Sequence, residues 1–223
     1  MNAYRFVSRS QPVRTLLTLA ALCFTLNVDA GSGLEATTEL QQRWAEIKYR
    51  LPEKQQESAL EQLTRAANQY LAENPDSPEL LIWKGIILST YAGAKGGLGA
   101  LSLVKEAKQS FEQALAIDPE ALSGSAYTSL GVLYYQVPGW PISFGNDKKA
   151  RQLLSKALEI NPNGIDSNYF YADFLVDQKD YILARQALDK ALQAPGRPNR
   201  PLADTGRRQE ILDLLAKIGD KAS

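Results

Sequence analysis

Apolar residues recur along most of the chain at the three- and four-residue spacing of amphipathic helices. Three segments share one pattern: an alanine, a large apolar residue four positions later, a second alanine three positions after that, and then a proline. The triplets are Ala107/Phe111/Ala114, Ala150/Leu154/Ala157 and Ala184/Leu188/Ala191, followed by Pro119, Pro162 and Pro195. These offsets place each triplet on one helical face, where the alanines let a neighbouring helix approach closely. The pattern therefore predicts a row of packed helices.

An apolar segment with its own small residue precedes each triplet. These segments contain Trp83 and Gly85, then Leu130, Gly131 and Tyr134, then Ala172. The combination resembles the tetratricopeptide repeat (TPR), a helical hairpin with a period of about 34 residues. In that family twelve residues separate the small residue of the first helix from the first alanine of the second. The step from Ala172 to Ala184 is 12, whereas Gly131 to Ala150 is 19 and Gly85 to Ala107 is 22. We therefore expect insertions at residues 92–102 and 137–146.

The resemblance implies an all-α, TPR-like array of about eight helices without strands, with capping helices at both ends. Residues 31–75 form N-terminal helices or a degenerate leading repeat, and residues 76–195 form three repeats. A stiff linker follows at 196–203, because Pro198 and Pro201 block helix formation there. Residues 204–223 carry an apolar stripe opposite Arg207 and Arg208, which predicts a final capping helix with a wet outer face.

The first thirty residues differ from the rest of the chain. Basic residues precede an apolar run of about a dozen residues, and Ala30 closes the segment, in the layout of a secretory signal peptide cleaved after about Ala30. The run is shorter than the roughly 20 residues that a spanning helix needs, so a retained membrane anchor is the less favoured alternative. Leu22 is large where a lipid-attachment motif needs a small residue, which argues against lipidation of Cys23. We expect an exported, periplasmic protein.

Composition excludes several classes of function. The chain has 25 Lys+Arg and 25 Asp+Glu, a formal net charge of 0, and no His. A neutral chain argues against nucleic acid as a partner, and the absence of His removes the commonest general base and metal ligand. The glycine-rich residues 92–102 lack the spacing of a phosphate loop. Ser102 and Lys105 match a serine-enzyme pair only by their spacing, without companion motifs. We expect no catalytic site, no metal and no cofactor.

The resemblance also implies a binding surface, because the first helices of TPR hairpins line a concave face at fixed pattern positions. One of these positions holds Glu79, Ser125 and Asp166 in the three repeats. The other candidate partner-binding residues on this face are Ile82, Ile86, Thr128, Val132, Tyr135, Gln136, Tyr169, Asp173 and Asp177. None of these residues is basic. A basic or mixed apolar protein or peptide therefore fits better than the acidic chaperone tails that some TPR domains bind.

The insertion at 137–146 adds two aromatic candidates, Trp140 and Phe144, in a segment stiffened by proline and glycine. It either folds back and buries its aromatic rings or forms a rigid lip over the groove, and both can hold together. The Pro-Gly-Trp-Pro motif at 138–141, together with the glycine-rich segment and the export signal, resembles the T-component family of TRAP transporters. That resemblance implies a periplasmic solute-binding protein as a partner, and oligomerisation. Our leading hypothesis is a binding scaffold, and the alternative is a small-ligand-binding accessory component of a TRAP-type transport system.

Overall fold

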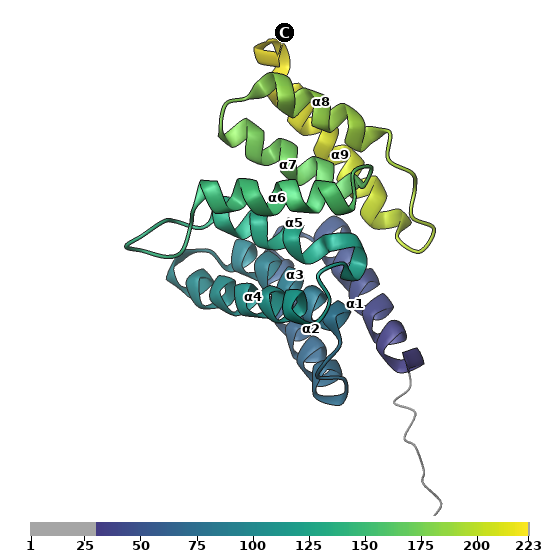
Figure 1. Ribbon diagram of the computed structural model, residues 1–223. Helices are drawn as coiled ribbons and strands as arrows, with labels where there is room; N and C mark the ends of the chain where they lie inside the picture. Colours follow the sequence, from purple (N-terminus) through teal and green to yellow (C-terminus); the bar gives the residue numbers. More distant parts are fainter. Residues whose placement is uncertain (1–29, 223) are drawn as a thin grey trace, which may run out of the picture.

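The computed structural model describes residues 30–222, so the expected signal peptide and Cys23 lie outside the described residues. These residues form nine α-helices and a final 3-10 turn, with no β-strand among them (Figure 1). The helices are α1 Ala30–Arg50, α2 Glu53–Glu73, α3 Pro78–Lys95, α4 Gly97–Ile117, α5 Ala121–Gln136, α6 Asp147–Ile160, α7 Ile165–Asp177, α8 Tyr181–Leu192 and α9 Pro201–Ile218, followed by the turn Gly219–Ala222. Helices α1 to α8 pair as successive hairpins, and α1, α3, α5 and α7 also contact one another in sequence. This confirms the all-α hairpin array, with one helix more than the eight expected.

Packing between paired helices follows the small-and-large pattern of the sequence. Phe111 of α4 has no exposed surface, and it lies against Gly85 of α3. A Cβ atom at Gly85 would come within 2.4 Å of the Phe111 ring, and one at Gly131 within 2.8 Å of the Leu154 side chain. Any larger residue at either position would push the two helices of the hairpin apart. The repeat signature therefore encodes a close approach of the helices.

Residues 92–102 differ from the loop that we expected. Helix α3 continues to Lys95 and α4 begins at Gly97, so these residues lengthen both helices. Gly96 and Gly97 break the run, with φ angles of 65° and 59° that glycine adopts without strain. Helices α3 and α4 have 18 and 21 residues, whereas α7 and α8 have 13 and 12. The extra residues therefore make this hairpin longer than the α5–α6 and α7–α8 hairpins that follow it.

Helix α9 returns to the beginning of the array. Its apolar residues Ile211 and Leu214 join a core cluster with residues of α7 and α8, and its N-terminal half reaches α1. Gly206 lies so close to the Tyr49 ring that a Cβ atom there would be 2.3 Å from it. The last helix thus packs on the first as well as on its own neighbours. None of the helices in the described part of the chain combines the length and the apolar character needed to cross a membrane.

Candidate functional site

Two of the predicted partner-binding residues lie in the core. Ile82 has no exposed surface and Thr128 is 5% exposed, so neither can contact a partner in this conformation. The reason for Ile82 is that α3 contacts α1, α2, α4 and α5, which cover nearly every face of the helix. Ile86 and Val132 are only partly exposed. Our expectation that Ile82 and Thr128 line a binding surface was therefore wrong.

Helices α5 and α7 bring three of the predicted residues together. The Tyr135 hydroxyl donates to Oδ2 of Asp173 at 2.6 Å, and the amide nitrogen of Gln136 lies 3.5 Å from the same oxygen. Burial raises the pKa of Tyr135 well above its ordinary value, and the negative charge of Asp173 raises it further. Asp177 lies one turn beyond Asp173 on α7, and the side-chain amide of Gln178 donates to it at 3.0 Å. We call Tyr135, Gln136, Asp173 and Asp177 the polar cluster.

The segment from Val137 to Asn146, which we call the Trp140 loop, projects from the array between α5 and α6 (Figure 1). Hydrogen bonds close it at its base, where the Gly145 amide donates to the Pro138 carbonyl at 3.0 Å. The amides of Ile142 and Ser143 each donate to the Gly139 carbonyl at 3.1 Å. These bonds give the loop a defined conformation although it contains no regular helix or strand.

The aromatic residues of the loop have two different environments. Phe144 is half-buried and packs edge-on against Tyr134, with 5.4 Å between the ring centroids. Trp140 is 90% exposed, and Ile142 beside it is 62% exposed. Phe144 thus folds back onto the array and fixes the loop, while Trp140 and Ile142 present apolar side chains to the surroundings. Ile142 was not among the residues singled out from the sequence, because a single isoleucine in a loop gives no pattern.

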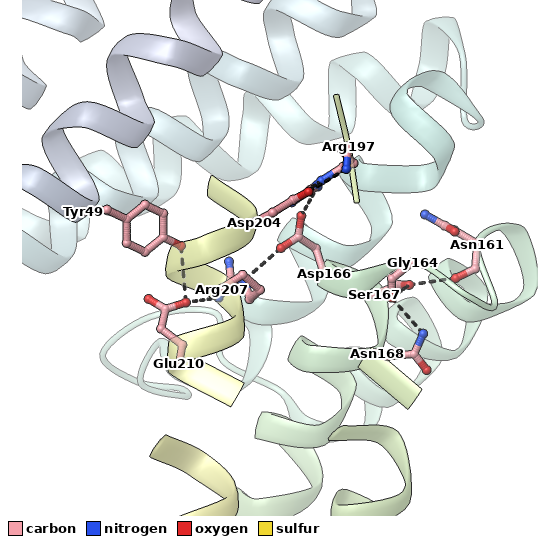
Figure 2. Close-up of polar contacts among 10 residues, drawn as sticks. All are labelled: Tyr49, Asn161, Gly164, Asp166, Ser167, Asn168, Arg197, Asp204, Arg207 and Glu210. Carbon is pink, nitrogen blue, oxygen red and sulfur yellow. Dashed lines mark hydrogen bonds and ion pairs between the residues drawn. The ribbon is translucent and has the colours of Figure 1, made fainter. Parts of the chain in front are cut away.

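A network of charged residues fixes α9 to the N-terminus of α7 (Figure 2). Arg197 Nη1 lies 2.6 Å from Oδ2 of Asp166, and Arg207 Nε lies 2.8 Å from Oδ1 of the same carboxylate. Arg197 also pairs with Asp204 at 2.6 Å, and Arg207 pairs with Glu210. Arg207 is 7% exposed, so our expectation that it lies on a wet outer face was wrong. We call Arg197, Arg200 and Arg207 the arginine clasp.

Electrostatics favour the charged form of Asp166. Burial by itself raises the pKa of this carboxyl, but the guanidinium groups of Arg207, Arg197 and Arg200 outweigh it and hold the pKa well below its usual range. The turn before α7 positions the carboxylate. In this turn Ser167 Oγ donates to the Asn161 carbonyl at 2.7 Å, and the Asn168 amide donates to the Gly164 carbonyl at 2.8 Å (Figure 2).

The arginine clasp also covers aromatic rings. The guanidinium of Arg207 lies 4.3 Å from the ring centre of Tyr169 and 4.5 Å from that of Phe170, and Arg200 lies 5.0 Å from the ring centre of Trp83. Burial raises the pKa of Tyr169 to about 12, although the charge of Arg207 opposes the shift. The chain itself therefore covers Tyr169, which we expected to face a partner. The sequence signal for this contact was the density of arginine between residues 197 and 208, but no local pattern identifies Asp166 as the acidic counterpart.

Among the described residues, no group of three or more His, Cys, Asp or Glu side chains is arranged to hold a metal ion. The Ser102 hydroxyl donates to the Gly99 carbonyl at 3.1 Å on an exposed face of α4. This is a local helix contact.

No protein-family model matches the chain, and no curated protein matches it. One solved structure that matches is described as "Functional Characterization of Pseudomonas Aeruginosa pilF". It shares 18% sequence identity and a TM-score of 0.35, over 85% of this chain and 96% of that chain. We draw no argument from a likeness of this size, so the TPR-like description rests on the repeat pattern and on the hairpin array. The resemblance to TRAP T-components receives no support from these comparisons.

Proposed function

We propose that the protein is a non-enzymatic scaffold that binds a protein or peptide partner through the Trp140 loop and the adjacent polar cluster. The observation that carries the proposal is the 90% exposure of Trp140 at the tip of a hydrogen-bonded loop. Tryptophan is enriched among the few residues that dominate binding energy at protein interfaces. A loop that is already ordered also loses little entropy when it binds.

The polar cluster lies beside this loop and supplies specificity. The Gln178 amide, next to Asp177, donates to Asp147 at the start of α6 at 3.2 Å, which ties the end of α7 to the end of the loop. The carboxylates of Asp173 and Asp177 therefore lie near the base of the loop, where it leaves α5 and enters α6. An apolar centre with a polar rim is the usual anatomy of a protein interface.

We further propose that the protein acts after export to the periplasm, which N-terminal sequencing of the protein isolated from its own cells tests directly.

The experiment compares binding of a partner by the wild-type protein and by a Trp140→Ala/Ile142→Ala variant. The partner is first recovered from the native cells by cross-linking and then purified, so that affinity is measured between two defined proteins. The matched control is Ile182→Ala/Leu212→Ala, which removes two large apolar side chains that are 57% and 49% exposed elsewhere on the surface. Loss of a binding hot spot costs about 2 kcal/mol or more, which is roughly a 30-fold loss of affinity. Equal affinity of the loop variant and the wild type would contradict the proposed surface.

A further inference from the structure

An open groove of about 710 Å³ lies at the opposite end of α5 from the Trp140 loop. The start of α1, the turn between α2 and α3, Leu122 at the start of α5, and Asn199 before α9 border it. The loop begins at the other end of α5, about 20 Å away at a rise of 1.5 Å per residue. The groove is therefore a separate surface.

The charged residues that line the groove are all acidic. Its lining includes the carboxylates of Glu73, Asp76 and Glu79, and none of the described residues that line it is basic. None of the three carboxylates forms an ion pair within the described part of the chain. Carboxylates that line one groove repel one another, so a cation bound in the groove would relieve that repulsion.

Two features beyond charge also point to a ligand in the groove. Thr37 lines it and is 2% exposed, yet its hydroxyl has no hydrogen-bond partner, although buried hydroxyls nearly always have one. Leu122 lines it with a φ of 49°, a left-handed conformation that is strained for leucine. This conformation holds an apolar side chain, 36% exposed, at the edge of the groove. The groove thus offers an apolar contact in addition to its charges, and a buried hydroxyl without a partner lies in its lining.

The repeat architecture supplies the strongest argument for the chemistry of that ligand. Glu79 is the second residue of α3, and Asp166 is the second residue of α7, so the two carboxylates occupy the same position of their repeats. At α7 the position is filled, because Arg197 and Arg207 of the same chain bind Asp166. At α3 the equivalent carboxylate of Glu79 lines the groove and accepts a hydrogen bond from Ser77 Oγ at 3.0 Å, but no cation of the described residues pairs with it.

We infer that the groove binds an extended cationic peptide segment, with an arginine at Glu79 in the way that arginines of the chain itself occupy Asp166. The remaining carboxylates, Glu73 and Asp76, hold a second cation of the segment. An apolar side chain of the segment packs on Leu122. This site is separate from the Trp140 loop, so it stands whether or not that loop binds a partner.

The test measures fluorescence anisotropy with a labelled eight-residue peptide that contains three arginines separated by leucine and glycine. A second peptide with glutamate in place of each arginine is the chemical control. The groove variant is Glu73→Gln/Asp76→Asn/Glu79→Gln. The matched protein control is Glu53→Gln/Asp189→Asn/Asp213→Asn, which removes the same charge at exposed positions outside the groove. Circular dichroism verifies that both variants fold.

We expect saturable binding of the arginine peptide to the wild type and no binding of the glutamate peptide. Exposed ion pairs contribute up to about 1 kcal/mol each, so the groove variant should bind about tenfold more weakly, and the protein control should bind like the wild type. Trp140→Ala should leave the affinity unchanged. Absence of saturable binding by the wild type would overturn the inference. An equal loss of affinity in the protein control would also overturn it, because attraction would then follow net charge and not the groove.

Discussion

The ion pairs of Asp166 give the sharpest test of how α9 is fixed to the array. The substitution Asp166→Asn keeps the size of the side chain and removes its charge. Arg197 and Arg207 would then face a neutral amide at the positions where they now lie 2.6 and 2.8 Å from carboxylate oxygens. Because Arg207 is 7% exposed, water cannot fully replace the lost partner.

The expected loss of stability follows from these contacts. A hydrogen bond to a charged group contributes roughly 1.5–3 kcal/mol, and two such bonds are weakened. Two factors reduce the loss: Arg197 keeps Asp204 and Arg207 keeps Glu210, and the Asp166 side chain is 31% exposed. We therefore expect the free energy of unfolding to fall by about 2 kcal/mol, which lowers the melting temperature by about 4–8 °C for a protein of this size.

Urea denaturation followed by circular dichroism measures this change. The control is Asp213→Asn, which removes a carboxylate from an exposed position of α9 and should change the free energy of unfolding by less than about 0.5 kcal/mol. Hydrogen exchange adds a local readout, since the amides of α9 should exchange faster in Asp166→Asn than in the control. A loss below about 0.5 kcal/mol in Asp166→Asn would refute the reasoning.

The same carboxylate predicts how stability depends on pH. The pKa of Asp166 is lower in the folded protein than in the unfolded chain, where it is about 3.9. Its contribution is therefore complete above that value and is lost as pH falls toward the lower pKa of the folded state. Wild type should lose more stability than Asp166→Asn between about pH 4 and pH 2. Parallel pH profiles for the two proteins would contradict this expectation.

Three further predictions test the core, the Trp140 loop and the polar cluster. Phe111→Ala should destabilise the protein by about 3–5 kcal/mol in urea denaturation, because the ring is fully buried against Gly85. Trp140→Phe should remove most of the acrylamide-quenchable tryptophan fluorescence, since Trp44 and Trp83 are 7% and 2% exposed; unchanged quenching would mean that the loop is covered. Tyr135→Phe should leave the tyrosine absorbance titration unchanged up to pH 11, because the pKa of this hydroxyl is raised well above its ordinary value.

The hairpins could be predicted from sequence because their signals are local. The alternation of small and large residues that places Phe111 against Gly85 lies within one pair of adjacent helices, and each proline ends a helix near its own repeat. Residues 92–102 misled the prediction because glycine costs about 1 kcal/mol in a helix interior, which favours a loop. Residues 93–99 are exposed, but Tyr91, Ala92 and Val104 on either side of them are buried between the helices. This flanking packing holds α3 and α4 together around the glycines, and local propensity contains no information about it.

The site was less predictable than the fold because it depends on contacts between distant segments. Repeat phase alone placed Tyr135 and Asp173 on neighbouring helices, where they do form a hydrogen bond. It could not show that a segment 31 residues beyond Asp166 returns to bind that carboxylate. Nor could it show that Ile82 is covered on all sides, since burial depends on how many helices meet at α3.

The arginine clasp changes which surfaces can select a partner. A partner that used the N-terminal part of α7 would first have to displace Arg207 from Tyr169 and Asp166. It would then have to supply cations of its own, because an unpaired carboxylate in a partly buried position is costly. Displacement therefore exchanges one set of ion pairs for an equivalent set and yields little net affinity. Selection of a partner is more favourable at the exposed Trp140 and at the carboxylate of Glu79, which forms no ion pair within residues 30–222.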